Sequence, residues 1–432
     1  MADSVRSVCE GYEDIRRADS LVEISERIRL DFSESKESFI SKVNKYLENP
    51  TDSMLSAWEK KKWIEWRMIV GERMFFNRAA SNLALLKTFY EDKDKPDQET
   101  SADPEMKDRL AHTTEIISSA SRNTGMMVPV HMKITYTITV NPDAVPDGET
   151  IRCWLPFPRE DHPRQTGAEH LTASQENFIL SPGSVTHRTI YMERNAEKGI
   201  PTTFSISYRY TSSGTWIDLS GASIKSYNRE SALYKKYTSE QLPHICFTDN
   251  VRRLADEITS PGDPPNVVVK KVYMWFKENI PWTGALEYSV IPNIPEYVLE
   301  NRRGDCGMQT FLFMSVLRYK GIPVRWQSGW KVPSGFKNLH DWCEVYYEGP
   351  GWVPADVSYD LQVSGDKKIR EFYCSGLDSY RLFINNGIAG PLYPPKKFMR
   401  SEPYDFQRGE VEWEGGNLYF DKWDYSMQIE YL

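Results

Sequence analysis

Residues 304–321, GDCGMQTFLFMSVLRYKG, constrain the fold more than any other stretch of the chain, because they place a cysteine at the first position of a helix. Asp305 is a typical N-cap, Gly321 is a typical residue after the last turn, and Pro323 prevents the helix from continuing. The pattern therefore predicts a helix of about four turns that begins at Cys306. Three residues share the face of the cysteine, which predicts that this face is buried: Thr310, Phe313 and Leu317.

The position of Cys306 has chemical consequences. Unpaired N–H groups and the dipole at a helix N-terminus favour an anion, so a thiol placed there ionises more readily and can act as a nucleophile. The carboxylate of Asp305 opposes this effect, so a histidine beside the sulfur would be needed as a base. The alternative is that Cys306 is a small apolar residue that packs in the core.

One segment offers a histidine and a carboxylate in a suitable arrangement. In NLHDWCEVYYEGPGWVPADVS two strand-like runs flank the turn EGPG, and His340 and Asp356 each lie eight residues from Glu348 at its tip. A tight hairpin would place these two side chains opposite each other, with Cβ atoms about 5 Å apart. The carboxylate would then hold one imidazole nitrogen while the other faces the thiol of Cys306.

Other interpretations of these residues remain open. A metal site made of Cys306, His340, Cys343 and Asp356 is disfavoured. His340 and Cys343 are three apart on one predicted strand, so they point to opposite faces and cannot easily share an ion. A structural role is the alternative for each residue taken alone. The six cysteines are scattered without a CxxC pair. The sequence therefore predicts no zinc site, no disulfide framework and no cofactor.

Composition limits the class of protein. A chain of 432 residues is too long for one compact domain, and 40% hydrophobic residues suffice for buried cores. The formal net charge of −8 argues against nucleic-acid binding. The start of the chain lacks an apolar signal-like stretch, and no run of about 18 apolar residues occurs. We therefore expect no membrane span and a cytoplasmic protein as the chain stands, or a periplasmic or secreted one if a signal peptide was removed.

The chain divides into four expected regions of an α+β protein. Residues 1–108 are expected to form a helical region that ends in an exposed linker, 91–108. Alternating stretches predict a β-sandwich-like domain at 123–220. Residues 221–390 contain the cysteine helix and the strand-like runs, and 391–432 are expected to form a β-rich C-terminal extension.

Three motifs within residues 265–360 resemble those of the transglutaminase-like superfamily. They are NRRGDCGMQTFLFMSVLRYKGIPVRWQSGW, LHDWCEVYY and GWVPADVS, in that order. The resemblance implies a papain-like core, in which the cysteine helix packs on an antiparallel sheet, and the preceding β-rich region is loosely similar to a domain of bacterial members. It also implies Cys306 as nucleophile, His340 as general base and acid, and Asp356 as orienting carboxylate. ADVS stands where the family more often has Asp-Pro-Thr, which leaves Asp356 in place.

The resemblance suggests further site residues. Members use an upstream aromatic or amide donor to hold the oxyanion, for which Trp282 is one candidate and Gln309 another. The backbone N–H of Cys306 is a further donor, since amides at a helix start suit a developing negative charge. Several tryptophans either line a substrate cleft or belong to the core: Trp326, Trp330, Trp342 and Trp352.

The expected reaction is acyl transfer on an amide bond through a thioester. Water as the second acceptor gives a peptidase or amidase, an amine gives a cross-linking transglutaminase, and peptide N-glycanases share the constellation. The animal cross-linking enzymes of the family carry calcium sites, whereas this sequence has no calcium loop of the type DxDxDG. We therefore expect hydrolysis of a peptide or related amide, with the other two activities as alternatives. A non-catalytic module that binds protein or glycan is the alternative of another class. The expected partner is a peptide or protein substrate, including a glycosylated one, and the oligomeric state is open.

Overall fold

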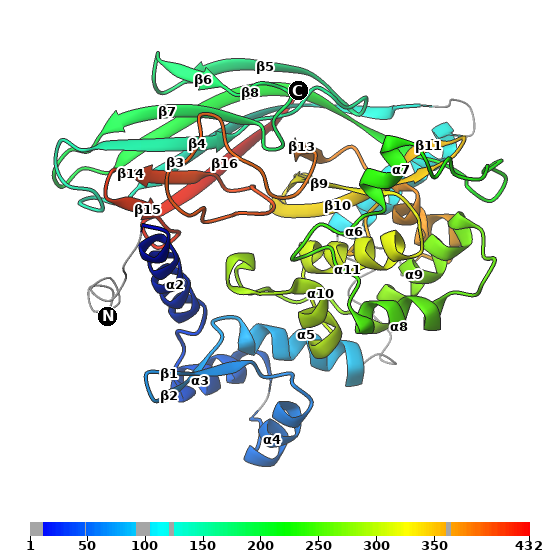
Figure 1. Ribbon diagram of the computed structural model, residues 1–432, viewed down its shortest axis with the longest axis horizontal. Helices are drawn as coiled ribbons and strands as arrows, with labels where there is room; N and C mark the ends of the chain where they lie inside the picture. The colour runs from blue at the N-terminus through cyan, green and yellow to red at the C-terminus, as the bar shows by residue number, and fades with distance from the viewer. Residues whose placement is uncertain (1–11, 48, 92–103, 121–124, 360–363) are drawn as a thin grey trace.

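The computed structural model describes residues 12–47, 49–91, 104–120, 125–359 and 364–432. These residues form helices and four sheets whose paired strands are antiparallel. Figure 1 shows a β-sandwich at the top, the cysteine helix and its neighbours below it, and the N-terminal helices at the base. The α+β fold class expected from the sequence is confirmed.

The β-sandwich consists of two five-stranded sheets with one shared hydrophobic core. Burial alternates along its longest strands, as expected when one face of a sheet is covered. One sheet contains β3 (Met127–Val140), β5 (Gln165–Ala173), β8 (Thr202–Trp216), β12 (Gly376–Leu377) and β16 (Trp423–Tyr431). The other contains β4 (Thr150–Pro156), β6 (Phe178–Leu180), β7 (Thr189–Asn195), β14 (Glu410–Trp413) and β15 (Gly416–Leu418).

The C-terminal strands β14, β15 and β16 lie in the segment 391–432, which was expected to be β-rich, and they complete this sandwich. Strand β16 pairs with β3 from Trp423 opposite Val140 to Tyr431 opposite Met132. Strand β14 pairs with β4 in the second sheet. Figure 1 shows β16 running beside β3, so the two ends of the sandwich sequence lie together although more than 200 residues separate them.

A second unit carries the cysteine helix and a four-stranded sheet in the order β11-β10-β9-β13. Its helices are α7 (Ala232–Tyr237), α8 (Asp249–Ile258), α9 (Pro265–Asn279), α10 (Ile294–Asn301), α11 (Cys306–Tyr319) and α12 (Lys367–Arg370), with short 3-10 turns η1 (Tyr288–Val290) and η2 (Phe372–Cys374). Its strands are β9 (Val324–Lys331), β10 (Asn338–Tyr347), β11 (Gly351–Ala355) and β13 (Arg381–Asn385). Helix α11 is buried along almost its whole length, because α8, α9, α10 and the sheet all pack on it.

Both ends of α11 follow the sequence prediction. The side chain of Asp305 accepts a hydrogen bond of 3.0 Å from the backbone N–H of Met308, which is the expected N-cap. Gly321 has φ +73°, a left-handed conformation that glycine adopts without strain, and the chain then enters β9.

The predicted register of the hairpin β10–β11 is wrong by two residues. Cys343 pairs with Ala355 and Tyr347 with Gly351, so His340 and Asp356 are not directly opposite each other. A shift of two keeps both side chains on the same face of the sheet, since successive residues alternate. His340 and Asp356 are therefore diagonal neighbours and can still meet.

The N-terminal region, which was predicted to be helical, contains a β-hairpin formed by β1 and β2. Its elements are α2 (Tyr12–Asp31), α3 (Lys36–Tyr46), α4 (Asp52–Lys60), β1 (Trp66–Ile69), β2 (Glu72–Phe75), α5 (Ala79–Glu91) and α6 (Pro104–Ala120). Val70 and Gly71 between the strands both have positive φ, +50° and +83°, as in a tight hairpin turn. Of the predicted linker, 92–103 lies outside the described residues, and the segment from Pro104 onward is helix.

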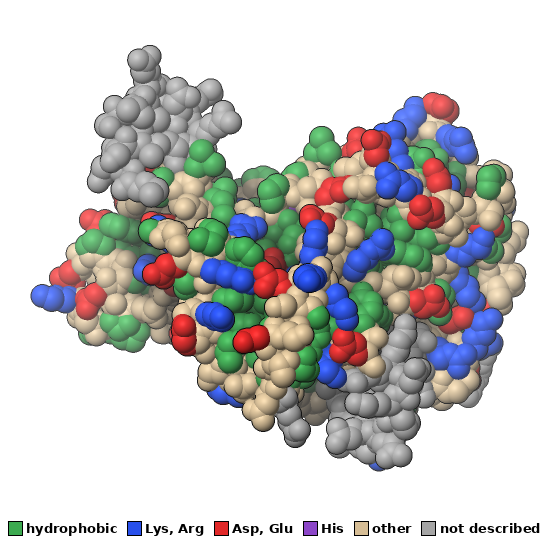
Figure 2. All heavy atoms as spheres, turned by 90° about the horizontal axis from the view of Figure 1, so that it is seen from below, with side chains coloured by type: hydrophobic (Ala, Val, Ile, Leu, Met, Phe, Trp, Pro, Cys, Tyr) green, Lys and Arg blue, Asp and Glu red, His purple; other side chains and the backbone are tan. Residues whose placement is uncertain are grey.

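The N-terminal region docks on the unit that carries the cysteine. The side-chain amide of Asn82 exchanges two hydrogen bonds of 2.8 Å with the backbone of Gly284, and both units share one core cluster. Figure 2 shows acidic and basic side chains interspersed over the face seen from below. Within the described residues, no helix has the length and apolarity needed to cross a bilayer.

Candidate active site

Cys306 begins α11 in a tightly packed setting. Its residue is 7% exposed, and its backbone carbonyl accepts a hydrogen bond of 2.8 Å from Thr310 one turn later. The hydroxyl of Tyr288 donates a 2.6 Å hydrogen bond to the N-cap carboxylate of Asp305. A Cβ at Gly307 would lie 2.2 Å from the Tyr288 hydroxyl and 2.7 Å from a carboxyl oxygen of Asp341, so only glycine fits after the cysteine.

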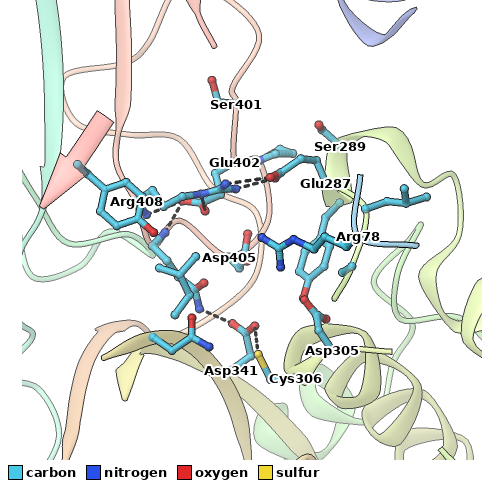
Figure 3. A pocket seen from close by; sticks show the side chains of 18 of the residues that line it. Arg78, Glu287, Ser289, Asp305, Cys306, Asp341, Ser401, Glu402, Asp405 and Arg408 are labelled. Carbon is cyan, nitrogen blue, oxygen red and sulfur yellow. Dashed lines mark hydrogen bonds and ion pairs between the residues drawn. The ribbon is translucent and has the colours of Figure 1, made fainter. Parts of the chain in front are cut away.

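The sulfur of Cys306 contacts the strand that carries the histidine. Its Sγ donates a 3.4 Å hydrogen bond to Oδ2 of Asp341, the residue that follows His340 on β10 (Figure 3). Gln407 donates 2.7 Å to the other Asp341 oxygen and 2.9 Å to the backbone carbonyl of His340. The start of α11, the start of β10 and the C-terminal segment therefore meet at the thiol.

His340 and Asp356 form a buried pair. Nε2 of His340 lies 2.6 Å from Oδ2 of Asp356, and Nη1 of Arg381 donates 2.9 Å to the same oxygen. Burial raises the pKa of the Asp356 carboxyl, but the charges of His340 and Arg381 outweigh it and hold the pKa well below its usual range. The carboxylate is thus ionised and assigns the proton to Nε2 of the imidazole.

Burial favours the neutral form of the His340 imidazole. Burial lowers the pKa of His340 below 6.5, and the nearby Asp356 carboxylate only partly compensates. Among the described residues, no hydrogen bond links His340 to the sulfur of Cys306, and Nδ1 has no hydrogen-bond partner. The structure thus joins His340 to Asp356 and Cys306 to Asp341.

A cavity of about 180 Å³ opens at the sulfur of Cys306 (Figure 3). Five parts of the chain besides α11 and its N-cap line it: the N-terminal region, the loop before and within η1, the start of β10, the segment 401–408 and strand β16. The charged side chains of its lining are Arg78, Glu287, Asp305, Asp341, Glu402, Asp405 and Arg408.

The two arginines of this cavity differ in their partners. Arg408 is neutralised, because it donates two hydrogen bonds to Glu287, 2.9 and 2.6 Å, and a third of 2.7 Å to Glu402. Arg78 precedes α5 and points into the cavity, and it forms no hydrogen bond or ion pair with any residue of the described ranges. The N-terminal region thus supplies the cavity with a free guanidinium.

Burial controls the titration of the groups at the sulfur. Burial raises the pKa of the Cys306 thiol well above its usual value, and the carboxyls of Asp341 and Asp305 raise it further. Burial likewise raises the pKa of Asp305 to about 6, and raises the pKa of Asp341 and Asp405 well above the usual range. The expected effect of the helix N-terminus on the thiol is therefore outweighed in this arrangement.

The two oxyanion candidates lie in different places. Trp282 is 42% exposed, lines the cavity at Cys306 and runs beside Gly304 in a short parallel bridge. The amide of Gln309 is buried and donates 3.0 Å to the carbonyl of Gly304, and it is not part of the cavity lining. Gln309 therefore holds the loop that leads into α11.

Three of the tryptophans that were candidates for a substrate cleft belong to the core instead. Trp326, Trp330 and Trp342 are each at most 2% exposed, and none of them lines the cavity at Cys306. Trp326 stacks on Phe311 of α11 with ring centroids 4.4 Å apart. Trp352 is half-buried and stands in the wall of a different cavity.

Several residues of the site were not found from the sequence. Asp341 stands between His340 and Trp342 without a sequence signal of its own, and Arg78, Tyr288 and Gln407 lie in segments without a motif. The one local signal was Gly307, since a glycine in the first turn of a helix indicates a close neighbour. Among the described residues, no group of three or more His, Cys, Asp or Glu side chains is arranged to hold a metal ion.

Comparison with known proteins identifies the core. The sequence model of the Transglutaminase-like superfamily matches residues 252–357. The uncharacterized protein YebA of Bacillus subtilis (strain 168) is 30% identical over 132 residues, which cover 26% of this chain. The match spans only 18% of the length of YebA.

Two solved structures show a distant likeness. A candidate cysteine protease from Cytophaga hutchinsonii is 15% identical with a TM-score of 0.48, and the alignment covers 71% of this chain and 91% of that one. The periplasmic domain of TgpA from Pseudomonas aeruginosa is 17% identical with a TM-score of 0.28, over 60% of this chain and 94% of that one. At these TM-scores neither likeness decides an activity.

The match to the superfamily covers α8 to α11 and the strands that carry His340 and Asp356. It indicates a cysteine-dependent enzyme family and specifies neither the reaction nor the substrate. Residues 252–357 of this chain therefore match the core of the Transglutaminase-like superfamily.

Proposed function

We propose that this protein hydrolyses a peptide or related amide bond with Cys306 as the nucleophile. The observation that carries the proposal is the buried pair of His340 and Asp356, which holds Nε2 of the imidazole and leaves Nδ1 without a hydrogen-bond partner among the described residues. Nucleophilic catalysis needs a thiol, an imidazole that accepts its proton and a carboxylate that orients the imidazole. Cys306, His340 and Asp356 would supply these three groups.

The reaction begins with the Sγ of Cys306 attacking the carbonyl carbon of the amide. Nδ1 of His340 takes the thiol proton as the C–S bond forms, and Asp356 stabilises the resulting imidazolium through Nε2. The imidazolium then gives its proton to the leaving nitrogen, the C–N bond breaks and the amine departs. Water attacks the thioester with His340 as base, which releases the carboxylic acid and restores the thiol.

The contact between Cys306 and Asp341 is the resting arrangement in this proposal. Because burial raises the pKa of the thiol, the sulfur stays protonated until a base within reach takes its proton. Substrate entry displaces the Asp341 carboxyl from the sulfur and brings the sulfur against Nδ1 of His340. The backbone N–H of Cys306 and the indole of Trp282 are the proposed donors to the oxyanion.

The acceptor in the second step is tested directly by mass spectrometry. Folded protein is incubated with a peptide library, with and without a primary amine such as cadaverine, and the products are identified. We expect new carboxylic acids or free amines in both samples, and none with the Cys306→Ala variant. Amine-linked products would favour the cross-linking alternative, release of glycan from glycopeptides would favour the N-glycanase-like one, and equal activity of Cys306→Ala would contradict the nucleophile.

A non-catalytic binding module is the second candidate. It is favoured by the hydrogen bond from the Cys306 thiol to Asp341 and by the absence of a hydrogen bond to His340 among the described residues. The discriminating measurement is the rate of iodoacetamide labelling at Cys306 from pH 5 to 10, followed by peptide mapping. Labelling that becomes slower in the His340→Ala variant supports the enzyme, because the imidazole then acts as the base for the thiol, whereas equal labelling of the parent and this variant supports the scaffold.

A further inference from the structure

A second and larger cavity, of about 920 Å³, lies between the end of α6, the end of β8 and the sheet β9–β11. It shares no lining residue with the cavity at Cys306. Its wall is largely apolar, with Ile117, Met126, Trp216, Ile217, Trp352 and Pro354 among the contributing residues. A cavity of this size is typical of sites that bind small organic molecules.

The wall of this cavity contains a buried arginine, Arg164, which is 3% exposed. Its Nε and Nη1 atoms are buried and have no hydrogen-bond partner among the residues that the structure describes. Burial lowers the pKa of Arg164 to about 10, so the guanidinium remains charged at neutral pH. A buried cation without a hydrogen-bonded partner is strongly unfavourable, and each such group in a native protein needs an explanation.

The other charged groups of the cavity are already engaged. Glu344 lies 2.8 Å from Nε2 of His162 and accepts hydrogen bonds of 2.6 Å from Arg325 and 2.7 Å from Gln327. At the rim, Lys368 pairs with Asp218 at 3.4 Å. Glu344 is the nearest compensating charge for Arg164, but no hydrogen bond connects the two residues, so an oxyanion can still bind there.

We propose that this cavity binds a small organic anion, in which a carboxylate or phosphate pairs with Arg164 and an apolar body fills the space between Trp216 and Trp352. The guanidinium supplies charged N–H donors, which form stronger hydrogen bonds with an oxyanion than neutral donors do. The apolar wall accounts for the body of the ligand, and Arg164 accounts for its charged group. This site does not depend on the activity proposed for Cys306.

Isothermal titration calorimetry of the full-length protein tests the site with matched probes. The probes are 4-phenylbutyrate, 4-phenylbutyl phosphate and the neutral 4-phenylbutanol, which share one apolar body. We expect at least one anion to bind about tenfold or more tighter than the alcohol. The better anion identifies which oxyanion the site prefers. The proposal is wrong if neither anion binds, or if the alcohol binds equally well.

Variants separate a binding role from a structural one. Arg164→Met keeps the side-chain volume and removes the charge, so it should weaken anion binding about tenfold, leave binding of the alcohol unchanged and keep or raise the melting temperature. Arg209→Met, which removes an exposed arginine on β8 outside the cavity wall, should leave binding unchanged. Unchanged anion binding by Arg164→Met would overturn the proposal.

A second variant covers the case in which Arg164→Met does not fold. Ile217→Trp keeps Arg164 and fills the apolar part of the cavity, so it should abolish binding of all three probes. If Ile217→Trp binds them as the parent does, the probes bind elsewhere and the proposal fails.

Discussion

The N-cap of the cysteine helix provides a prediction whose size follows from the structure. Asp305 is half-buried, and the loss of solvation raises the pKa of its carboxyl from 3.8 to about 6 despite hydrogen bonds from Tyr288 and Met308. A carboxyl whose pKa is raised by folding keeps its proton longer in the folded chain than in the unfolded one. The contribution of Asp305 to the free energy of unfolding is therefore fully present below about pH 4 and is lost as pH rises through about 6.

The magnitude follows from linkage. A shift of about two pKa units corresponds to about 3 kcal/mol of unfolding free energy, and about 2 kcal/mol of this is lost between about pH 4.5 and 7.5. Asparagine cannot ionise but remains a good N-cap that accepts the same hydrogen bonds. The free energy of unfolding of Asp305→Asn should therefore rise relative to that of the parent by about 2 kcal/mol between about pH 4.5 and 7.5.

Urea unfolding at several pH values between about 4.5 and 7.5 measures this difference for parent and variant. Asp366→Asn is a matched control, because Asp366 caps α12 in the same way but is exposed to water. Its effect should not change with pH by more than a few tenths of a kcal/mol. The argument is refuted if the difference for Asp305→Asn does not depend on pH, or if the variant loses stability relative to the parent as pH rises.

Three further predictions concern single side chains. His340→Ala should lower kcat/KM for amide hydrolysis about 1,000-fold, because it removes the group that transfers the proton. Asp356→Asn should lower it about 100-fold, because it disturbs only the orientation of the imidazole. A variant with the same kcat/KM as the parent would remove its residue from the mechanism. Arg78→Ala should lower the ratio of iodoacetate to iodoacetamide labelling at Cys306 about threefold, because the guanidinium attracts the anionic reagent. The control Arg29→Ala, which removes an exposed arginine, should leave this ratio unchanged. An unaltered ratio in Arg78→Ala would mean that Arg78 does not act on the cavity. Trp326→Leu should reduce the unfolding free energy by about 3 kcal/mol in urea titrations, and a loss below about 1 kcal/mol would contradict its place in the core.

The local signals in the sequence were sufficient for the cysteine helix. Its first residue, its N-cap and the glycine that follows it were all predicted, because capping and helix termination depend on residues within one or two turns. The strand-like runs that became β3, β8, β9, β10 and β11 were found for the same reason, since alternation is a local pattern.

Pairing between strands was not predictable to the same degree. The hairpin register was wrong by two residues, because the turn is centred on Gly349 and not on Glu348 as the prediction assumed. Strand β16 completes a sheet with β3, and no local pattern encodes a partner almost 300 residues away. The hairpin β1–β2 was assigned to helix because its apolar residues also recur at helical intervals.

The candidate site was predictable only where a motif marked it. Cys306, His340 and Asp356 stand in motifs, and the contact between His340 and Asp356 survives the register error because a shift of two preserves the face of the strand. Arg78 and Gln407 reach the cavity through tertiary packing of the N-terminal region and the C-terminal segment. Such contributions depend on docking between distant segments, which spacing and periodicity do not describe.

The most direct test of the account is to look for an acyl group on Cys306. Wild-type protein is mixed with the best peptide from the library, quenched in acid within the first turnover and examined by intact-mass and peptide-mapping mass spectrometry. The account predicts an added mass equal to the acyl fragment on the peptide that contains Cys306, removed by hydroxylamine and absent from Cys306→Ala. Product formation without this adduct, at the same rate in Cys306→Ala, would contradict it.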